Sequence, residues 1–274
     1  MLINIKGQLT DFSRPKVMGI LNLTPDSFFD GGKYDSDLHY LTQTEKMLHD
    51  GADILDIGAF STRPGGEWVS EDEELKRLLV PLEQILKKFP ETIISVDTFR
   101  SKVAQKTIET GAAMINDISA GNLDNDMFNT VAALQVPYIM MHIRGNHTSM
   151  HKKTIYDDVV KDVLHELSKR FFEARNAGIN DIIIDPGFGF SKTIEQNYEI
   201  MQKLELFHIF EKPLLVGISR KSMIYKLLDG NPESSLNGTT ALNMYALTKG
   251  THILRVHDVK ETVECVKLYT QISN

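Results

Sequence analysis

The sequence predicts a single (β/α)8 barrel, and three observations support this fold class. Short, continuous apolar runs recur along the chain, and runs of this length suit strands buried on both faces of a parallel sheet. Amphipathic helical patterns fall between the runs, and a polar side chain stands where each run stops. The active site of such a barrel is built at the carboxyl ends of its strands. The eight runs cover residues 18–22, 54–58, 93–97, 114–117, 139–142, 182–185, 214–219 and 253–257.

The bulk composition is compatible with one TIM barrel domain over residues 1–274. With 42% hydrophobic residues, the chain can bury one sizeable core. The net charge of −7 and the scattered basic residues leave no electrostatic footprint for nucleic acid. The single Cys265 excludes an internal disulfide framework and a cysteine-based zinc site. No secretory signal and no stretch of ~20 apolar residues is visible, so we expect no membrane partner and a cytoplasmic protein.

The segments outside the runs predict the remaining elements. Residues 2–12 alternate loosely around Gly7, which predicts a short N-terminal hairpin that caps the bottom of the barrel. Helices are expected at 36–50 and at 101–110, each followed by a glycine and each with apolar residues on one side. The last helix is expected at 259–272.

Two longer helices carry start and stop signals. Ser70 followed by Glu73 indicates a capping box, and Pro81 within the same helical pattern predicts a kink or a restart. A second helix is expected to begin at Asp157 as its N-cap and to stop at Gly178. A doubly wound open sheet is the alternative to the barrel. Eight strand–helix units, with polar candidates spread over most of them, favour closure.

Long loops follow the first two runs. The eleven residues NLTPDSFFDGG that begin at Asn22 hold turn signals, but they exceed what a turn requires. They indicate either a plain connection or a mobile lid that carries Phe28 and Asp30, with Asn22 at the barrel mouth. The STRPGG segment after the second run is either a rigid turn with a solvated Arg63 or a loop whose guanidinium binds a carboxylate or phosphate.

Three amide or carboxylate side chains end later runs: Asp97, Asn116 and Asp185. A lone Asp at a strand end is often only the N-cap of the next helix. Three such groups at one barrel mouth would offer acceptors and a donor to the amide-and-amine edge of a flat heterocycle, such as a pterin or guanine.

The last three runs add an aromatic residue and several cations. Phe190 ends a Gly-rich loop, DPGFGF, and could form an apolar wall, whereas Lys221 in SRKS is either solvated, which the motif alone favours, or a fixed pocket cation. Strand alternation puts Arg255 and His257 on one side, beside a helix N-terminus, which favours an anion site over pairing of Arg255 with a carboxylate. The role of His142 is undecided. No Ser-His-Asp order, P-loop or HExxH motif is present.

With these residues assembled, the chain resembles the dihydropteroate synthase family of the folate pathway. The motifs GILNLTPDSF, STRPG, SVDT, IND, DPGFGF, SRKS and RVHDV occur in the family's order over nearly the whole length. The resemblance implies a Mg²⁺-dependent transferase that joins p-aminobenzoate to 6-hydroxymethyl-7,8-dihydropterin diphosphate and releases pyrophosphate. It also implies a homodimer.

The resemblance implies a role for each matching residue. It assigns the pterin to Asp97, Asn116, Asp185 and Lys221. It assigns the diphosphate to Asn22, Arg255 and His257, with Asn22 reaching Mg²⁺. It assigns the p-aminobenzoate site to Phe28, Thr62, Arg63, Pro64, Phe190, Lys221 and Ser222, closed by the first loop. The residues expected to take part in catalysis are Asp30, Lys221 and Arg255.

The implied reaction explains why no catalytic triad is needed. Loss of pyrophosphate leaves a methylene cation conjugated with an electron-rich ring, so the protein must neutralise the leaving group and exclude water. Two alternatives remain. A corrinoid-linked methyltransferase would share the Asp/Asn clamp but would not use SRKS or an Arg–His anchor. A non-catalytic pterin-binding paralogue would be expected to show gaps in the anion site or the first loop.

The sequence departs from the family pattern in two places. Ala59 and Phe60 stand where the family usually has Gly-Glu. His147, Ser149 and His151 stand in a loop after the fifth run where the family has Pro-x-Thr-Met-Gln. Neither change touches the expected pterin or anion residues.

Overall fold

A closed parallel barrel forms the body of the molecule. The computed structural model describes residues 1–23, 36–59, 69–146 and 149–273. Eight strands pair in parallel in the order β8-β7-β6-β5-β4-β3-β10-β9, and a bridge between Ile184 and Leu214 links the two ends of this sheet. The predicted barrel is therefore confirmed, and the alternative of an open, doubly wound sheet is excluded. The strands are β3 (Lys16–Asn22), β4 (Ile54–Gly58), β5 (Ile94–Asp97), β6 (Met114–Asp117), β7 (Tyr138–Met141), β8 (Ile182–Asp185), β9 (Leu215–Val216) and β10 (Ile253–Val256).

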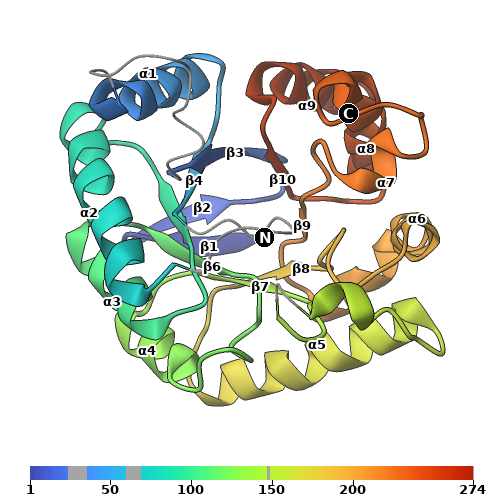
Figure 1. Ribbon diagram of the computed structural model, residues 1–274, viewed down its shortest axis with the longest axis horizontal. Coiled ribbons are helices and arrows are strands. Elements are labelled where there is room, and N and C mark those ends of the chain that lie inside the picture. The colour runs from blue at the N-terminus through green and yellow to red at the C-terminus, as the bar shows by residue number, and fades with distance from the viewer. Residues whose placement is uncertain (24–35, 60–68, 147–148, 274) are drawn as a thin grey trace.

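Helices form an outer ring around these strands (Figure 1). They are α1 (Ser36–His49), α2 (Glu71–Lys88), α3 (Ser101–Thr110), α4 (Met127–Leu134), α5 (Val159–Asn176), α6 (Ile194–Gln202), α7 (Ser222–Tyr225), α8 (Leu236–Thr248) and α9 (Val259–Ser273). Short 3₁₀ turns occur at η2 (Met150–Lys152), η3 (Leu204–Phe210) and η4 (Glu233–Ser235). Within the described ranges, no helix is long and apolar enough to cross a membrane.

The predicted N-terminal hairpin is confirmed. Strands β1 (Leu2–Ile5) and β2 (Gln8–Asp11) pair antiparallel around Lys6 and Gly7, both of which have positive φ. The hairpin and the residue that follows it carry three buried apolar side chains, Ile3, Ile5 and Phe12. These pack on an apolar layer inside the barrel that consists of Met18, Ile54, Ala113, Met114, Ile139, Ile183, Leu215 and Ile253. The hairpin thus closes the bottom of the barrel.

The start of α2 forms only part of the predicted capping box. The Ser70 hydroxyl accepts a hydrogen bond from the Glu73 amide (3.2 Å), but the Glu73 carboxylate pairs with Arg77 Nε at 2.8 Å. A complete capping box opens α6 instead, where Thr193 and Gln196 bond reciprocally. The S/T-x-x-E/Q spacing marks the start of both helices, and a competing cation decides whether the second bond forms.

Two other helix predictions are corrected. Helix α2 continues through Pro81, so the predicted restart is wrong; the packed apolar face holds the helix despite one missing backbone bond. The N-cap of α5 is Asp158 and not Asp157. The Asp158 backbone is extended, and its carboxylate accepts from the amides of Val160 and Lys161. With two adjacent aspartates, the residue where the chain leaves the extended conformation becomes the cap.

Candidate active site

Strand alternation places a polar layer directly above the apolar layer. Side chains two residues apart on a strand share a face, and four polar residues here stand two positions after an apolar interior residue, whereas Asp97 stands two positions after the buried Ser95. The pairs are Ile54 with Asp56, Met114 with Asn116, Ile183 with Asp185, and Ile253 with Arg255. The sequence therefore builds one polar end inside a mostly apolar barrel interior.

A buried carboxylate, Asp56, connects the predicted pterin and anion residues. Its Oδ2 accepts from Arg255 Nε at 2.6 Å and from Asn116 Nδ2 at 2.9 Å. Arg255 Nη2 donates to Asp97 Oδ2 at 2.8 Å. Arg255 is thus paired with two carboxylates, as the less favoured interpretation of the sequence had it, and its anion role stays a prediction. Sequence reasoning missed Asp56, although an Asp inside an apolar run was a visible signal.

Burial shifts the proton affinities of the site residues. It raises the pKa of Asp97 to about 7, against the opposing effect of the Arg255 guanidinium, and it raises the pKa of Asp185. It lowers the pKa of Lys221 to about 8, although the nearby Asp185 favours the charged form. These groups are held partly desolvated, which strengthens their interaction with any polar ligand.

The Gly-rich loop after β8 brings Phe190 and Lys221 together. Asp185 Oδ1 accepts from the Gly187 amide at 2.7 Å. The Lys221 ammonium donates to the carbonyl of Phe188 and lies 4.6 Å from the centre of the Phe190 ring. Lys221 is therefore a fixed cation against this loop, and not the solvated lysine that its motif alone favoured.

The other predicted residues are distributed around the same end of the barrel. Asn22 ends β3 beside Gly58 of β4, and Ser222 begins α7. His257 follows β10, where its backbone amide and its Nδ1 each lie 3.1 Å from Ser219 Oγ. Five predicted residues lie outside the described part of the chain: Phe28, Asp30, Thr62, Arg63 and Pro64. Phe60 and His147 also lie outside it.

His142, whose role the sequence left undecided, lies behind the Gly-rich loop. It is buried, with Nε2 2.9 Å from Glu166 Oε2 and Nδ1 3.0 Å from Lys192 Nζ. Burial lowers its pKa to about 4. Sequence reasoning missed Glu166 and Lys192, because neither stands at the end of an apolar run.

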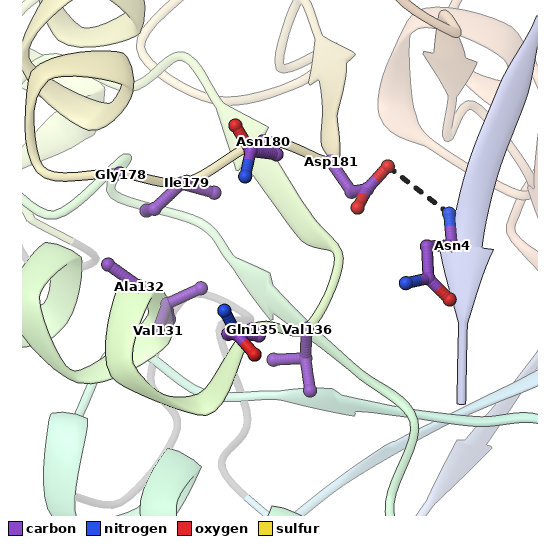
Figure 2. A pocket seen from close by; sticks show the side chains of 9 residues that line it. All are labelled: Asn4, Val131, Ala132, Gln135, Val136, Gly178, Ile179, Asn180 and Asp181. Carbon is purple, nitrogen blue, oxygen red and sulfur yellow. Dashed lines mark hydrogen bonds between the residues drawn. The ribbon is translucent and has the colours of Figure 1, made fainter. Parts of the chain in front are cut away.

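A pocket at the opposite end of the barrel is a separate feature. It has a volume of about 140 Å³ and lies beside α4, the turn before β8 and the hairpin (Figure 2). Asp181 at its edge accepts from the Asn4 backbone amide at 3.2 Å. This pocket is at the amino ends of the strands, whereas barrel chemistry is built at their carboxyl ends.

Among the described residues, no group of three or more His, Cys, Asp or Glu could hold a metal ion.

Comparisons with known proteins decide the family. The pterin binding enzyme family matches residues 18–257. Dihydropteroate synthase of Escherichia coli K12 is 42% identical over 270 residues, which is 98% of this chain and 95% of that protein. This chain belongs to the dihydropteroate synthase family. As a member of that family it is a transferase of folate biosynthesis.

Solved structures of the family share the whole fold. Xanthomonas albilineans dihydropteroate synthase with 4-aminobenzoic acid superposes with a TM-score of 0.92 at 36% identity and covers 99% of this chain and 98% of its own. Yersinia pestis dihydropteroate synthase in a sulfonamide complex gives a TM-score of 0.93 at 39% identity, over 100% of this chain and 99% of its own.

Proposed function

We propose that the polar end of this barrel condenses 6-hydroxymethyl-7,8-dihydropterin diphosphate with p-aminobenzoate to give 7,8-dihydropteroate and pyrophosphate. The observation that carries the proposal is the network around Asp56. One buried carboxylate orients both Asn116 and Arg255, which places hydrogen-bonding groups for a heterocycle and a guanidinium in one layer. A corrinoid-linked methyltransferase would not use the SRKS segment that holds Lys221 or an anchor of Arg255 and His257, so the synthase reaction is favoured.

The pterin is proposed to lie across this layer. Because the Asn116 amide nitrogen donates to Asp56, its oxygen is turned to accept a ligand N–H. Asp97 and Asp185 supply further acceptors for the amino and ring N–H groups. Lys221 is proposed to donate to the ring carbonyl, and its charge balances the carboxylates.

The diphosphate is proposed to be held by Arg255, His257 and Asn22. Mg²⁺ takes few protein ligands and completes its shell with substrate phosphates and water, so the hard amide oxygen of Asn22 at the end of β3 suits it. When bound, this ion would offset the negative charge of the leaving pyrophosphate. Arg255 does the same from the polar layer, since its guanidinium stays charged at all relevant pH.

The proposed reaction is dissociative. The bond between the pterin methylene carbon and oxygen breaks with its electron pair going to pyrophosphate. The resulting cation is delocalised over the ring, the arylamine nitrogen forms the new C–N bond, and the nitrogen then loses a proton. Because the arylamine is neutral at pH 7, no strong base is required. Phe190 and the Lys221 stem form an apolar wall that excludes water from this cation.

Pyrophosphate release tests the proposal. We would measure it with Mg²⁺ and the pterin diphosphate, with and without p-aminobenzoate, for the wild type and for Arg255→Ala. Release should depend on p-aminobenzoate and fall by about 100-fold or more in the variant. Arg77→Ala, which breaks only a surface pair with Glu73, is the matched control and should be unaffected. Pterin binding without turnover would favour the binding paralogue, and no pterin binding would overturn the assignment.

The chain is also proposed to act as a cytoplasmic homodimer. Helices α8 and α9 pack together and expose Tyr245, Leu268 and Ile272, the last two 61% and 77% exposed. A second copy could cover this apolar face. Light scattering after size exclusion should report a dimer for the wild type and a monomer for Leu268→Glu. A wild-type monomer at micromolar concentration would contradict this proposal.

A further inference from the structure

Lys192 is a buried cation that the proposed reaction does not use. It stands just after the Gly-rich loop and is only 8% exposed. Its ammonium lies 2.9 Å from the Gly187 carbonyl, 3.0 Å from the Phe190 carbonyl and 3.0 Å from His142 Nδ1. An ammonium has three hydrogens, and all three have an acceptor here. Two of them hold the backbone of the loop that carries Phe190.

Lys192 is itself held in place by a hydrogen-bonded series of side chains that begins at His142. Because His142 Nδ1 accepts from the ammonium, Nε2 carries the hydrogen and donates to Glu166 Oε2. Glu166 Oε1 in turn accepts from Arg144 Nε at 2.9 Å. The contacts require a neutral His142, which agrees with its buried position. This series of hydrogen bonds, from Arg144 through Glu166 and His142 to Lys192, links the segment after β7 and helix α5 to the Gly-rich loop.

The loop backbone has little freedom to move. A Cβ on Gly187 would lie 2.0 Å from the His142 carbonyl oxygen, so the loop packs directly on the end of β7. The Gly189 amide donates to Asn197 Oδ1 at 2.7 Å. With Gly187, Gly189 and Phe190 held in this way, the Phe188 carbonyl is directed at Lys221.

We propose that Lys192 is a positioning residue of the synthase site. By holding the carbonyls of Gly187 and Phe190, it sets the Phe188 carbonyl and the Phe190 ring against Lys221, and so fixes the wall and the cation that meet the arylamine. This inference rests on the proposed function. In this proposal Lys192 does not contact the substrate. It affects the binding of p-aminobenzoate through the positions of Lys221 and Phe190.

Steady-state kinetics of Lys192→Met test the inference. Methionine keeps the length and apolar stem but removes all three donors, so the loop should loosen around Phe190. The KM for p-aminobenzoate should rise about tenfold, and the KM for the pterin diphosphate should rise less, because two of its four proposed contacts, Asp97 and Asn116, do not touch this loop. Lys203→Met, which removes an exposed lysine paired with Glu199, is the matched control and should change neither.

A merely structural role predicts a different result. It would lower the melting temperature and the active fraction, which reduces kcat and leaves both KM values unchanged; that result would overturn the inference. Lys192→Gln retains two donors, and it should give an intermediate KM for p-aminobenzoate. This milder variant keeps the test valid if the methionine variant does not fold.

A second measurement needs no substrate. Acetic anhydride labelling, read by mass spectrometry of the Lys221 peptide, reports how firmly the Lys221 amine is held. Labelling should be several-fold faster in Lys192→Gln than in the wild type. A wild type without p-aminobenzoate-dependent release would defeat the proposed function. An active wild type with unchanged KM and labelling in the Lys192 variants would defeat only this inference.

Discussion

A few buried charges determine what this barrel can bind. Asp56 has no exposed surface, and its Oδ2 serves two donors from different strands. Its Oδ1 is buried without a hydrogen-bond partner among the described residues. A buried carboxylate in this position is costly unless its cationic partner stays in place. The position of Asn116 therefore depends on Asp56, and that of Arg255 depends on Asp56 and Asp97 together.

Asp56→Asn is expected to reduce both stability and activity. The new amide oxygen can still accept hydrogen bonds but carries no charge, so the guanidinium keeps only Asp97 as an ion-pair partner. Unfolding free energy should fall by about 3 kcal/mol, and kcat/KM should fall at least tenfold. Urea denaturation and pyrophosphate release measure the two effects. Asp53→Asn, at the other end of the barrel beside Lys16, should cost less than about 1 kcal/mol.

Lys221 is expected to set the alkaline limit of activity. Burial lowers its pKa to about 8. The cation is present below that pH and is lost as the pH rises through it, so kcat/KM should fall above about pH 8. In Lys221→Arg any remaining activity should continue to higher pH, because a guanidinium does not deprotonate there. An unchanged alkaline limb in this variant would assign the limit to another group.

At the scale of elements, the Gly-rich loop after β8 depends on glycine at the positions where it packs against the residues of the proposed site. Gly187 and Gly189 both have positive φ, which disfavours residues with a Cβ. Gly187 also packs on the His142 carbonyl, and Gly189 packs on the Lys221 stem. Backbone freedom and close approach are thus needed at the same positions, and the loop can hold Lys221 only with glycine there.

Gly187→Ala and Gly7→Ala form a matched pair. Both positions have positive φ, but a Cβ at Gly7 would meet nothing within 4 Å, whereas one at Gly187 would clash with backbone. Gly7→Ala should cost about 1 kcal/mol from backbone strain alone and leave activity intact. Gly187→Ala should cost more and raise the KM for p-aminobenzoate. Equal melting temperatures and equal kinetics for the two variants would contradict this account.

At the scale of the whole molecule, the barrel is divided into an apolar end and a polar end. The hairpin β1–β2 supplies Ile3 and Ile5 to the apolar end, and Phe12 directly after it completes the apolar layer under the proposed site. The polar end can then hold charged groups without opening a path for water from below. The bottom layer therefore contributes to stability, whereas the proposed chemistry is at the top.

Phe12→Ala is expected to lower stability at the apolar end and to leave substrate binding at the polar end unchanged. Phe12 has no exposed surface, so its truncation should cost about 3–5 kcal/mol of unfolding free energy through lost burial and a cavity. The folded fraction should keep its KM values for both substrates, because the polar layer is not touched. Leu9→Ala, at a 70% exposed position of β2, is the control and should change stability by less than about 0.5 kcal/mol. Altered KM values for Phe12→Ala would show that the two ends are coupled.

The sequence by itself determined the barrel and the hairpin, and it predicted the end of the barrel where the site is proposed to lie. Apolar runs, helical spacing and the polar residue after each run are local patterns. Each can be read from the order of apolar and polar residues within one segment. Asp97, Asn116, Asp185 and Arg255 could be singled out for this reason. Family motifs added their expected roles.

Only the tertiary structure decided which side chains meet. Arg255 and Asp56 are 199 residues apart in the chain, and His142 and Lys192 are 50 apart. Such pairings depend on barrel closure and on strand register, which place side chains from distant segments at one height. Local choices were decided in the same way, as when Asp158 and not Asp157 capped α5. A hydrogen bond needs two atoms within about 3 Å, and no pattern along a single segment contains that distance.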